Sequence, residues 1–256
     1  MKILAIGDVT EPRAVTYLTE NLPRFRRENG IDFCIVNAEN AGLISGPDPD
    51  MAEALLEGGA DILTGGNHTL QKKALHPILE HSRRVLRPTN YPPEAPGMGH
   101  SILTAGGLRI LVMNAIGRVN MEPADCPFHA IDRILAREKG EYDLAFLDFH
   151  AEATGEMLAM GHYLDGRVTG VFGTHTHVPT ADEQILPKGT AYITDIGMCG
   201  AGNGILGISP EVIIKRFLTR LPERYMAADG PVRADGVIFE VDSTTRRATE
   251  ISRIRF

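Results

Sequence analysis

The sequence predicts an α/β fold in which mixed β-sheets are sandwiched between helices. In the first quarter of the chain, short apolar runs alternate with helical segments, a pattern that favours parallel strands joined by helical crossovers. In the middle, two β-like runs are separated by Gly106-Gly107, which indicates an antiparallel hairpin. Because the last two runs also alternate like antiparallel strands, either an open mixed sheet or two sheets between helices fits this order.

The first elements follow from apolar runs and their stop signals. Pro23 is expected to begin a second helix at its first turn, because proline is favoured there. Gly58-Gly59 ends a helix that begins at Met51. The predicted strands here lie at residues 2–7, 31–36 and 61–64, and the predicted helical segment before the second strand spans residues 13–29.

The rest of the chain continues this alternation. Strands are expected at residues 101–105, 108–117, 142–149, 168–173, 183–186, 191–194, 237–242 and 248–256, and helices at 130–139 and 152–163. Two segments rich in glycine or proline, residues 88–99 and 197–207, are expected to be ordered surface loops. Neither segment divides the chain cleanly, so we expect residues 1–256 to form a single domain.

Composition narrows the class of protein. Hydrophobic residues make up 43% and charged residues 23% of the chain, which is enough apolar material for a substantial core. The formal net charge of −7 argues against binding to duplex DNA, which normally requires a basic surface. The negative charge is still compatible with small phosphate substrates, because bound divalent ions supply a local positive field.

The expected compartment is the cytoplasm. The three cysteines, Cys34, Cys126 and Cys199, are widely spaced and form no pair typical of a disulfide framework. The apolar run at the start ends at Asp8, which is too short for the core of a signal peptide. Because no stretch approaches the roughly 18 apolar residues of a membrane span, no membrane partner is expected.

Seven candidate metal ligands lie just past predicted strand ends, where open α/β sheets expose functional groups. They are Asp8, Glu39, Asn40, Asn67, His150, His175 and His177. Oxygen and imidazole donors without a thiolate suit Fe, Mn or Zn, and a carboxylate can bridge two ions. The set therefore predicts a site for two metal ions that hydrolyses phosphoesters.

The motif GTHTH carries the sharpest local signal. In a regular strand, His175 and His177 would point to opposite faces, so both reach one cluster only if the segment is a loop. Gly173 and Pro179 on either side favour a loop. His150 alone would be read as a buried core histidine, and Asn67 alone as a turn residue. Their shared position after strands favours the functional interpretation.

Other catalytic motifs are missing from the sequence. It contains no GxSxG elbow, no GxxxxGK[ST] phosphate loop and no GxGxxG after the first strand. The sequence therefore gives no motif support for a serine hydrolase, a kinase or a dinucleotide-binding enzyme.

The ordered series GDV, NAEN, GNH, a histidine after a strand, and GTHTHV resembles the calcineurin-like metallophosphoesterases, and most closely their YmdB-like branch of bacterial phosphodiesterases. The similarity runs over nearly the whole chain. It implies the layered metallophosphoesterase fold and a tendency to form a homo-oligomer. Where the wider superfamily has a histidine two residues beyond the first aspartate, this chain has Thr10, and in the YmdB-like branch the position of Asn40 takes that role.

The resemblance also implies a role for each residue. One ion would be held by Asp8, Glu39, Asn40 and His177, and the other by Glu39, Asn67, His150 and His175. The two ions would be divalent or of mixed valence, and a hydroxide bridging them would attack phosphorus. His68 would protonate the leaving alkoxide. The implied substrates are small phosphodiesters or nucleotides, including cyclic nucleotides of the 2′,3′ or 3′,5′ type.

Two segments depart from the pattern of the branch, Thr10–Ala14 and Gly197–Gly207, and we expect both to border the substrate pocket. Two other functions stay open. One is a regulatory protein that binds a nucleotide or RNA and whose metal centre senses a ligand, and the other is a metal-dependent amide or ester hydrolase. The retention of His68 beside a full ligand set favours the enzyme, and the acidic charge balance disfavours an extended RNA surface.

Overall fold

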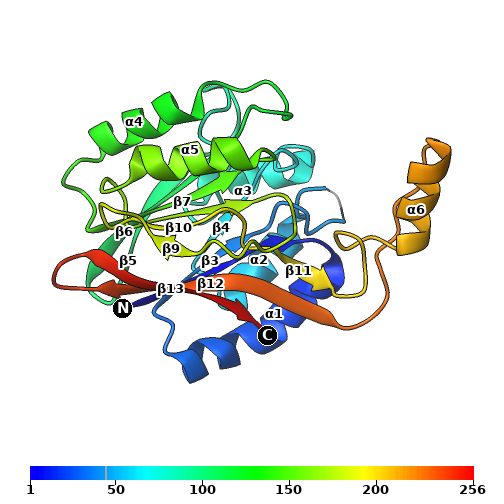
Figure 1. Cartoon of the computed structure of the whole chain (residues 1–256), viewed down its shortest axis with the longest axis horizontal. Coiled ribbons are helices and arrows are strands. Elements are labelled where there is room, and N and C mark those ends of the chain that lie inside the picture. The colour runs from blue at the N-terminus through cyan, green and yellow to red at the C-terminus, as the bar shows by residue number, and fades with distance from the viewer. Residues whose placement is uncertain (44) are drawn as a thin grey trace.

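The computed structural model describes residues 1–43 and 45–256. It shows two β-sheets that lie face to face between two layers of helices (Figure 1). The predicted fold class is confirmed, in its two-sheet form. Among the described residues, no helix is long and apolar enough to cross a membrane.

The first sheet has the strand order β2-β11-β12-β1-β3-β4, with β13 paired to β12. β1, β3 and β4 are parallel, whereas β12 runs antiparallel to β1, β11 and β13. Its strands are β1 (Lys2–Ile6), β2 (Asp8–Val9), β3 (Phe33–Asn37), β4 (Ile62–Thr64), β11 (Met198–Ala201), β12 (Val232–Asp242) and β13 (Arg247–Arg255).

The second sheet has the order β5-β6-β7-β8-β10-β9. The predicted hairpin across Gly106-Gly107 is confirmed as the antiparallel pair β5 and β6, and β6, β7, β8 and β10 are parallel. The strands are β5 (His100–Ala105), β6 (Leu108–Ile116), β7 (Leu144–His150), β8 (Gly170–Thr174), β9 (Gln184–Ile185) and β10 (Ala191–Ile193).

Helices cover the outer face of each sheet. The first sheet is covered by α1 (Pro12–Asn29), α2 (Pro49–Glu57) and α3 (His76–His81), which follows a short 3₁₀ turn (Lys73–Leu75), and the second by α4 (Pro127–Arg137) and α5 (Thr154–Leu164). The helix α6 (Pro210–Thr219) stands away from both layers (Figure 1). The sequence analysis did not anticipate α6.

The alternation of side chains along the strands builds the layers. In β1, Ile3 and Ala5 point into the core between the two sheets, whereas Leu4 and Ile6 point toward the helices. The inter-sheet core also holds Phe239 from the first sheet and residues of β6, β7, β8 and β10 from the second. Packing therefore fixes how the strand ends of one sheet face those of the other.

The prediction that a second helix begins at Pro23 is wrong, because α1 continues through this residue. The buried face of α1 includes Leu18 and Leu22 and extends up to the proline without a break. An internal proline removes one helical hydrogen bond, and the packing of this face against the sheet outweighs that loss.

The segment Gly197–Gly207, predicted as a loop, contains the buried strand β11. β11 pairs parallel with β2, so that Asp8, expected just past the end of a strand, lies in a second, short strand. This pairing requires a close approach, since a Cβ atom on Gly200 would lie 2.0 Å from Thr10 Oγ1. The local glycine content suggested a loop, but here it allows two strands to meet.

Candidate metal centre

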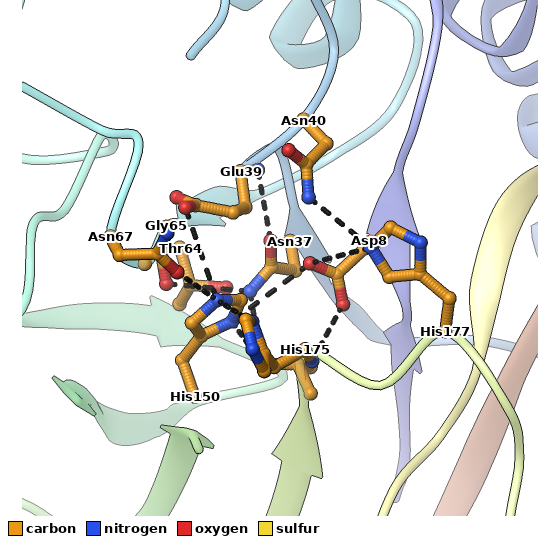
Figure 2. A network of polar contacts seen from close by, with 12 residues as sticks. Asp8, Asn37, Glu39, Asn40, Thr64, Gly65, Asn67, His150, His175 and His177 are labelled. Carbon is orange, nitrogen blue, oxygen red and sulfur yellow. Dashed lines mark hydrogen bonds and ion pairs between the residues drawn. The ribbon is translucent and has the colours of Figure 1, made fainter. Parts of the chain in front are cut away.

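All eight predicted site residues gather where parallel strands of both sheets end, and Figure 2 shows seven of them pointing toward one another. Asp8 lies just past β1, Glu39 and Asn40 follow β3, Asn67 and His68 follow β4, His150 ends β7, and His175 and His177 follow β8. The carboxyl ends of the two sheets thus meet at one edge of the sandwich.

One half of the cluster surrounds the Asp8 carboxylate. Its Oδ1 atom lies 3.8 Å from His177 Nε2, and Asn40 Nδ2 lies 3.2 Å from the same imidazole nitrogen. Asp8 Oδ2 accepts a hydrogen bond from the backbone N–H of His175 (3.0 Å). Asp8 Oδ1 is fully buried and has no hydrogen-bond partner among the described residues.

The other half surrounds His150 Nε2. This atom lies 3.1 Å from Asn67 Oδ1, 3.0 Å from His175 Nδ1 and 3.9 Å from Glu39 Oε1. The two imidazole rings meet edge to face, with centroids 4.7 Å apart. Nitrogen and oxygen atoms of four side chains therefore converge on one point.

The protonation of these rings follows from their outer contacts. Thr174 Oγ1 donates its proton to Asp148 Oδ1 (2.7 Å), so toward His150 Nδ1 (2.9 Å) it can only accept, which places the proton of His150 on Nδ1. His175 Nε2 donates to Glu152 Oε2 (3.1 Å). Burial lowers the pKa of His150 well below its ordinary value and also lowers that of His175.

Burial thus favours the neutral form of both rings, in which His150 Nε2 and His175 Nδ1 face each other as unprotonated nitrogens and Asn67 Oδ1 lies beside His150 Nε2. Three lone pairs that face one another repel unless a cation lies between them. The donor set thus fits a metal ion. As they stand, however, no three His, Cys, Asp or Glu side chains within residues 1–43 and 45–256 are arranged to hold an ion by themselves. A ligand set here would also have to include the amide oxygens of Asn40 and Asn67.

The charges of the cluster also fit bound metal ions. Burial raises the pKa of Asp8 to about 8, and burial together with the Asp8 charge raises the pKa of Glu39 well above its ordinary value. In the described part of the chain, the ion-pair partners of these two carboxylates are histidines, not lysine or arginine. Two buried carboxylates without a permanent counter-charge fit bound cations.

The prediction that His175 and His177 lie in a loop is confirmed, although Gly173 and Thr174 of the motif still belong to β8. His175 and His177 adopt positive φ angles of 110° and 62°, which turn both rings toward the cluster. Asp195 holds the loop by accepting hydrogen bonds from the Thr176 backbone N–H (3.0 Å) and hydroxyl (2.9 Å), and from the backbone N–H of Gly197 (2.7 Å). The unusual backbone is thus stabilised by a buried carboxylate that the sequence analysis did not identify.

A second group of buried polar residues was also missed. Asp148 lies inside the apolar strand β7 and accepts hydrogen bonds from Asn37 Nδ2 (2.9 Å), Thr64 Oγ1 (2.5 Å) and Thr174 Oγ1. Burial raises its pKa to about 6. A carboxylate within a buried apolar run is a signal in the sequence, because such a group must be hydrogen-bonded in the fold.

Replacing Thr174 by valine is expected to lower activity by about 10- to 100-fold, the usual effect of losing an outer partner of a metal-binding histidine. Valine has a similar shape but leaves Asp148 Oδ1 and His150 Nδ1 without this shared partner, which should reduce the free energy of unfolding by about 1–3 kcal/mol. Thr174→Ser keeps the hydroxyl, so it should retain most of the activity and most of the free energy of unfolding. Equal effects of valine and serine on activity would contradict the role of the hydroxyl.

His68 lies at the open side of the cluster. Its Nδ1 donates to Asn40 Oδ1 (2.8 Å) and lies 3.2 Å from Glu39 Oε1, while its backbone N–H donates to the same carboxylate oxygen. Burial lowers the pKa of His68. With Nδ1 engaged, Nε2 is the ring atom left for chemistry. His68, His175 and His177 line a cavity of about 730 Å³.

Only one of the two divergent segments borders the cavity. Gly197–Gly207 borders this cavity as expected, through Ile205 and Leu206. Thr10–Ala14 does not line the cavity, and that expectation is wrong. Thr10 is buried, and its hydroxyl donates to the backbone carbonyl of Cys199 (3.1 Å) in the neighbouring strand.

Two packed mixed sheets flanked by helices, with polar side chains of both sheets meeting at the strand ends, define a metallophosphoesterase-type protein. The chain belongs to the YmdB-like protein family, whose model matches residues 4–254. The predicted resemblance is therefore confirmed.

Individual relatives agree with this assignment. The 2′,3′-cyclic-nucleotide 2′-phosphodiesterase of Bacillus subtilis (strain 168) is 43% identical over 254 residues, which cover 99% of this chain and 96% of that protein. The structure of a hypothetical protein from Thermus thermophilus superimposes with a TM-score of 0.93 at 40% identity and covers 100% of this chain and 99% of that one. A novel phosphatase from Mycoplasma pneumoniae gives a TM-score of 0.93 at 34% identity, over 100% and 93% of the two chains.

Proposed function

We propose that this protein is a phosphodiesterase that binds two metal ions and hydrolyses small phosphodiesters, including cyclic nucleotides of the 2′,3′ or 3′,5′ type. Its family and relatives assign the chain to the phosphoric ester hydrolases. The observation that carries the finer proposal is the convergence of unprotonated nitrogens, amide groups and buried carboxylates, including the unpartnered Asp8 Oδ1, beside one cavity.

The contacts support two ligand groups that share Glu39. Asp8, Asn40 and His177 would hold one ion with it, and Asn67, His150 and His175 would hold the other. Asn40 would have to turn its amide, because it presents Nδ2 to His177 as it stands. Such ions, as Fe, Mn or Zn of divalent or mixed valence, would lower the pKa of a bound water molecule and polarise the phosphoryl oxygens.

The protein itself would supply the proton for the leaving group. His68 Nδ1 lies 3.2 Å from Glu39 Oε1, which orients the ring when Asn40 has turned its amide and leaves Nε2 free on the cavity side. The nearby Glu39 carboxylate would stabilise the imidazolium form. His68 Nε2 would then transfer its proton to the departing alkoxide oxygen. The burial of Asp8 and Glu39 lowers the local dielectric constant and strengthens these interactions.

Metal analysis and a substrate panel test this proposal. Protein purified without a chelator should contain about two metal ions per chain and, with added Mn²⁺, should turn over many molecules of a cyclic nucleotide or another phosphodiester. Faster cleavage of carboxylic esters than of phosphodiesters would favour the ester hydrolase instead. Stoichiometric nucleotide binding without turnover would favour the ligand sensor and contradict the proposal. Homo-oligomer formation stays a prediction.

A further inference from the structure

The cavity extends from the metal centre to a wall built by α6 and its neighbours. Its lining includes His68, His175 and His177 from the metal centre, and Ile213 and Phe217 from α6. The volume of about 730 Å³ falls within the range of pockets that hold ligands larger than a bare phosphate group. A phosphoester bound at the metal end would therefore have room for a substantial substituent facing α6.

The side chains of this wall combine flat aromatic surfaces with positive charge. Phe217 is 75% exposed although it borders the cavity. The guanidinium group of Arg216 lies over the ring of Tyr225, 5.2 Å from its centroid, and Arg220 lines the same wall. The acidic residue of the lining, Glu152, contacts His175 of the metal centre.

We infer that the α6 wall binds the nucleobase of a nucleotide substrate, with Phe217 providing the stacking surface and Arg216 and Arg220 adding positive charge that attracts the ester. Stacking uses the flat face that every base has, so this wall selects nucleotides over other phosphodiesters without strong preference among bases. The inference rests on the proposed phosphodiesterase function, because it assigns the substituent of the ester cleaved at the metal centre.

Kinetics on a matched pair of substrates test the inference. Adenosine 2′,3′-cyclic phosphate carries a base, whereas methyl riboside 2′,3′-cyclic phosphate carries the same ester without one. Phe217→Ala should raise KM for the nucleotide by about tenfold, as expected when one base-stacking side chain is removed, and leave KM for the base-free ester nearly unchanged. Leu218→Ala is the matched control, because Leu218 is 80% exposed and lies outside the lining.

A binding measurement does not depend on turnover. The natural chain has no tryptophan, so Phe217→Trp introduces a single fluorescent reporter in the wall. Titration of the metal-loaded variant with adenosine 3′-monophosphate should quench its emission, whereas ribose 5-phosphate should not. Leu218→Trp should respond to neither compound.

The outcomes separate this inference from the proposed function. If Phe217→Ala raised KM equally for both esters, or if both tryptophan variants were quenched alike, the base would not bind at the α6 wall. If the unaltered protein cleaved neither ester while Phe217→Trp was still quenched selectively, the wall would bind bases and the hydrolytic proposal would fail for this ester class. Cleavage of both esters without selective quenching would overturn only the inference.

Discussion

Replacing Asp8 by asparagine is expected to lower phosphodiesterase activity by about 10³-fold or more, because under the proposed function it removes a negatively charged ligand from a site that would offset two cations. The side chain keeps its shape and can still accept the hydrogen bond from the His175 backbone N–H. Local structure should therefore survive, and the loss should appear as missing metal in elemental analysis of the purified variant.

Stability provides the decisive control for this variant. In the unaltered protein, the buried Asp8 Oδ1 has no hydrogen-bond partner among the described residues, which is unfavourable when no cation is bound. The metal-free Asp8→Asn protein should therefore melt at the same temperature as the metal-free natural protein or above it. Added metal should raise the melting temperature of the natural protein only. A large loss of stability in the metal-free variant would show that Asp8 is a structural residue.

Replacing His68 by alanine is expected to slow the cleavage of a cyclic nucleotide by about 10²- to 10⁴-fold, the usual contribution of a general acid. Bound metal should be nearly unchanged, because the backbone N–H of His68, which the substitution keeps, donates to Glu39. The measurement pairs steady-state kinetics with elemental analysis. Retention of full activity would exclude the proton-donor role.

The leaving group distinguishes a proton donor from a residue that only supports the fold. A bis-aryl phosphodiester releases a stable aryloxide that hardly needs a proton, so His68→Ala should cleave it at a rate much closer to that of the natural protein. His81→Ala is a matched control, since His81 is exposed on α3 and lies outside the cavity. An equal loss on both kinds of substrate would indicate damage to the metal centre instead.

Local patterns in the sequence were sufficient for most strands and for the candidate ligands at their ends, but not for the paired strands β2 and β11. The apolar run before Asp8, the run before Glu39 and the GTHTH motif each placed polar donors after a strand, and all these residues gather in the structure. Asp148 and Asp195 were missed because their role depends on partners far along the chain. The continuation of α1 through Pro23 was missed because packing against the sheet decides it.

By itself, the sequence determined the layered α/β class and the chemistry of the donors, since strand periodicity and residue type are local properties. Tertiary structure decided which donors face one another, because only the packing of two sheets brings the ends of β1, β3, β4, β7 and β8 to one edge. It also decided the proton position on His150 through Thr174 and Asp148, and it placed α6 over the cavity. Those contacts join residues that are distant in the sequence. They can form and stabilise the site only once the core has brought the two sheets together.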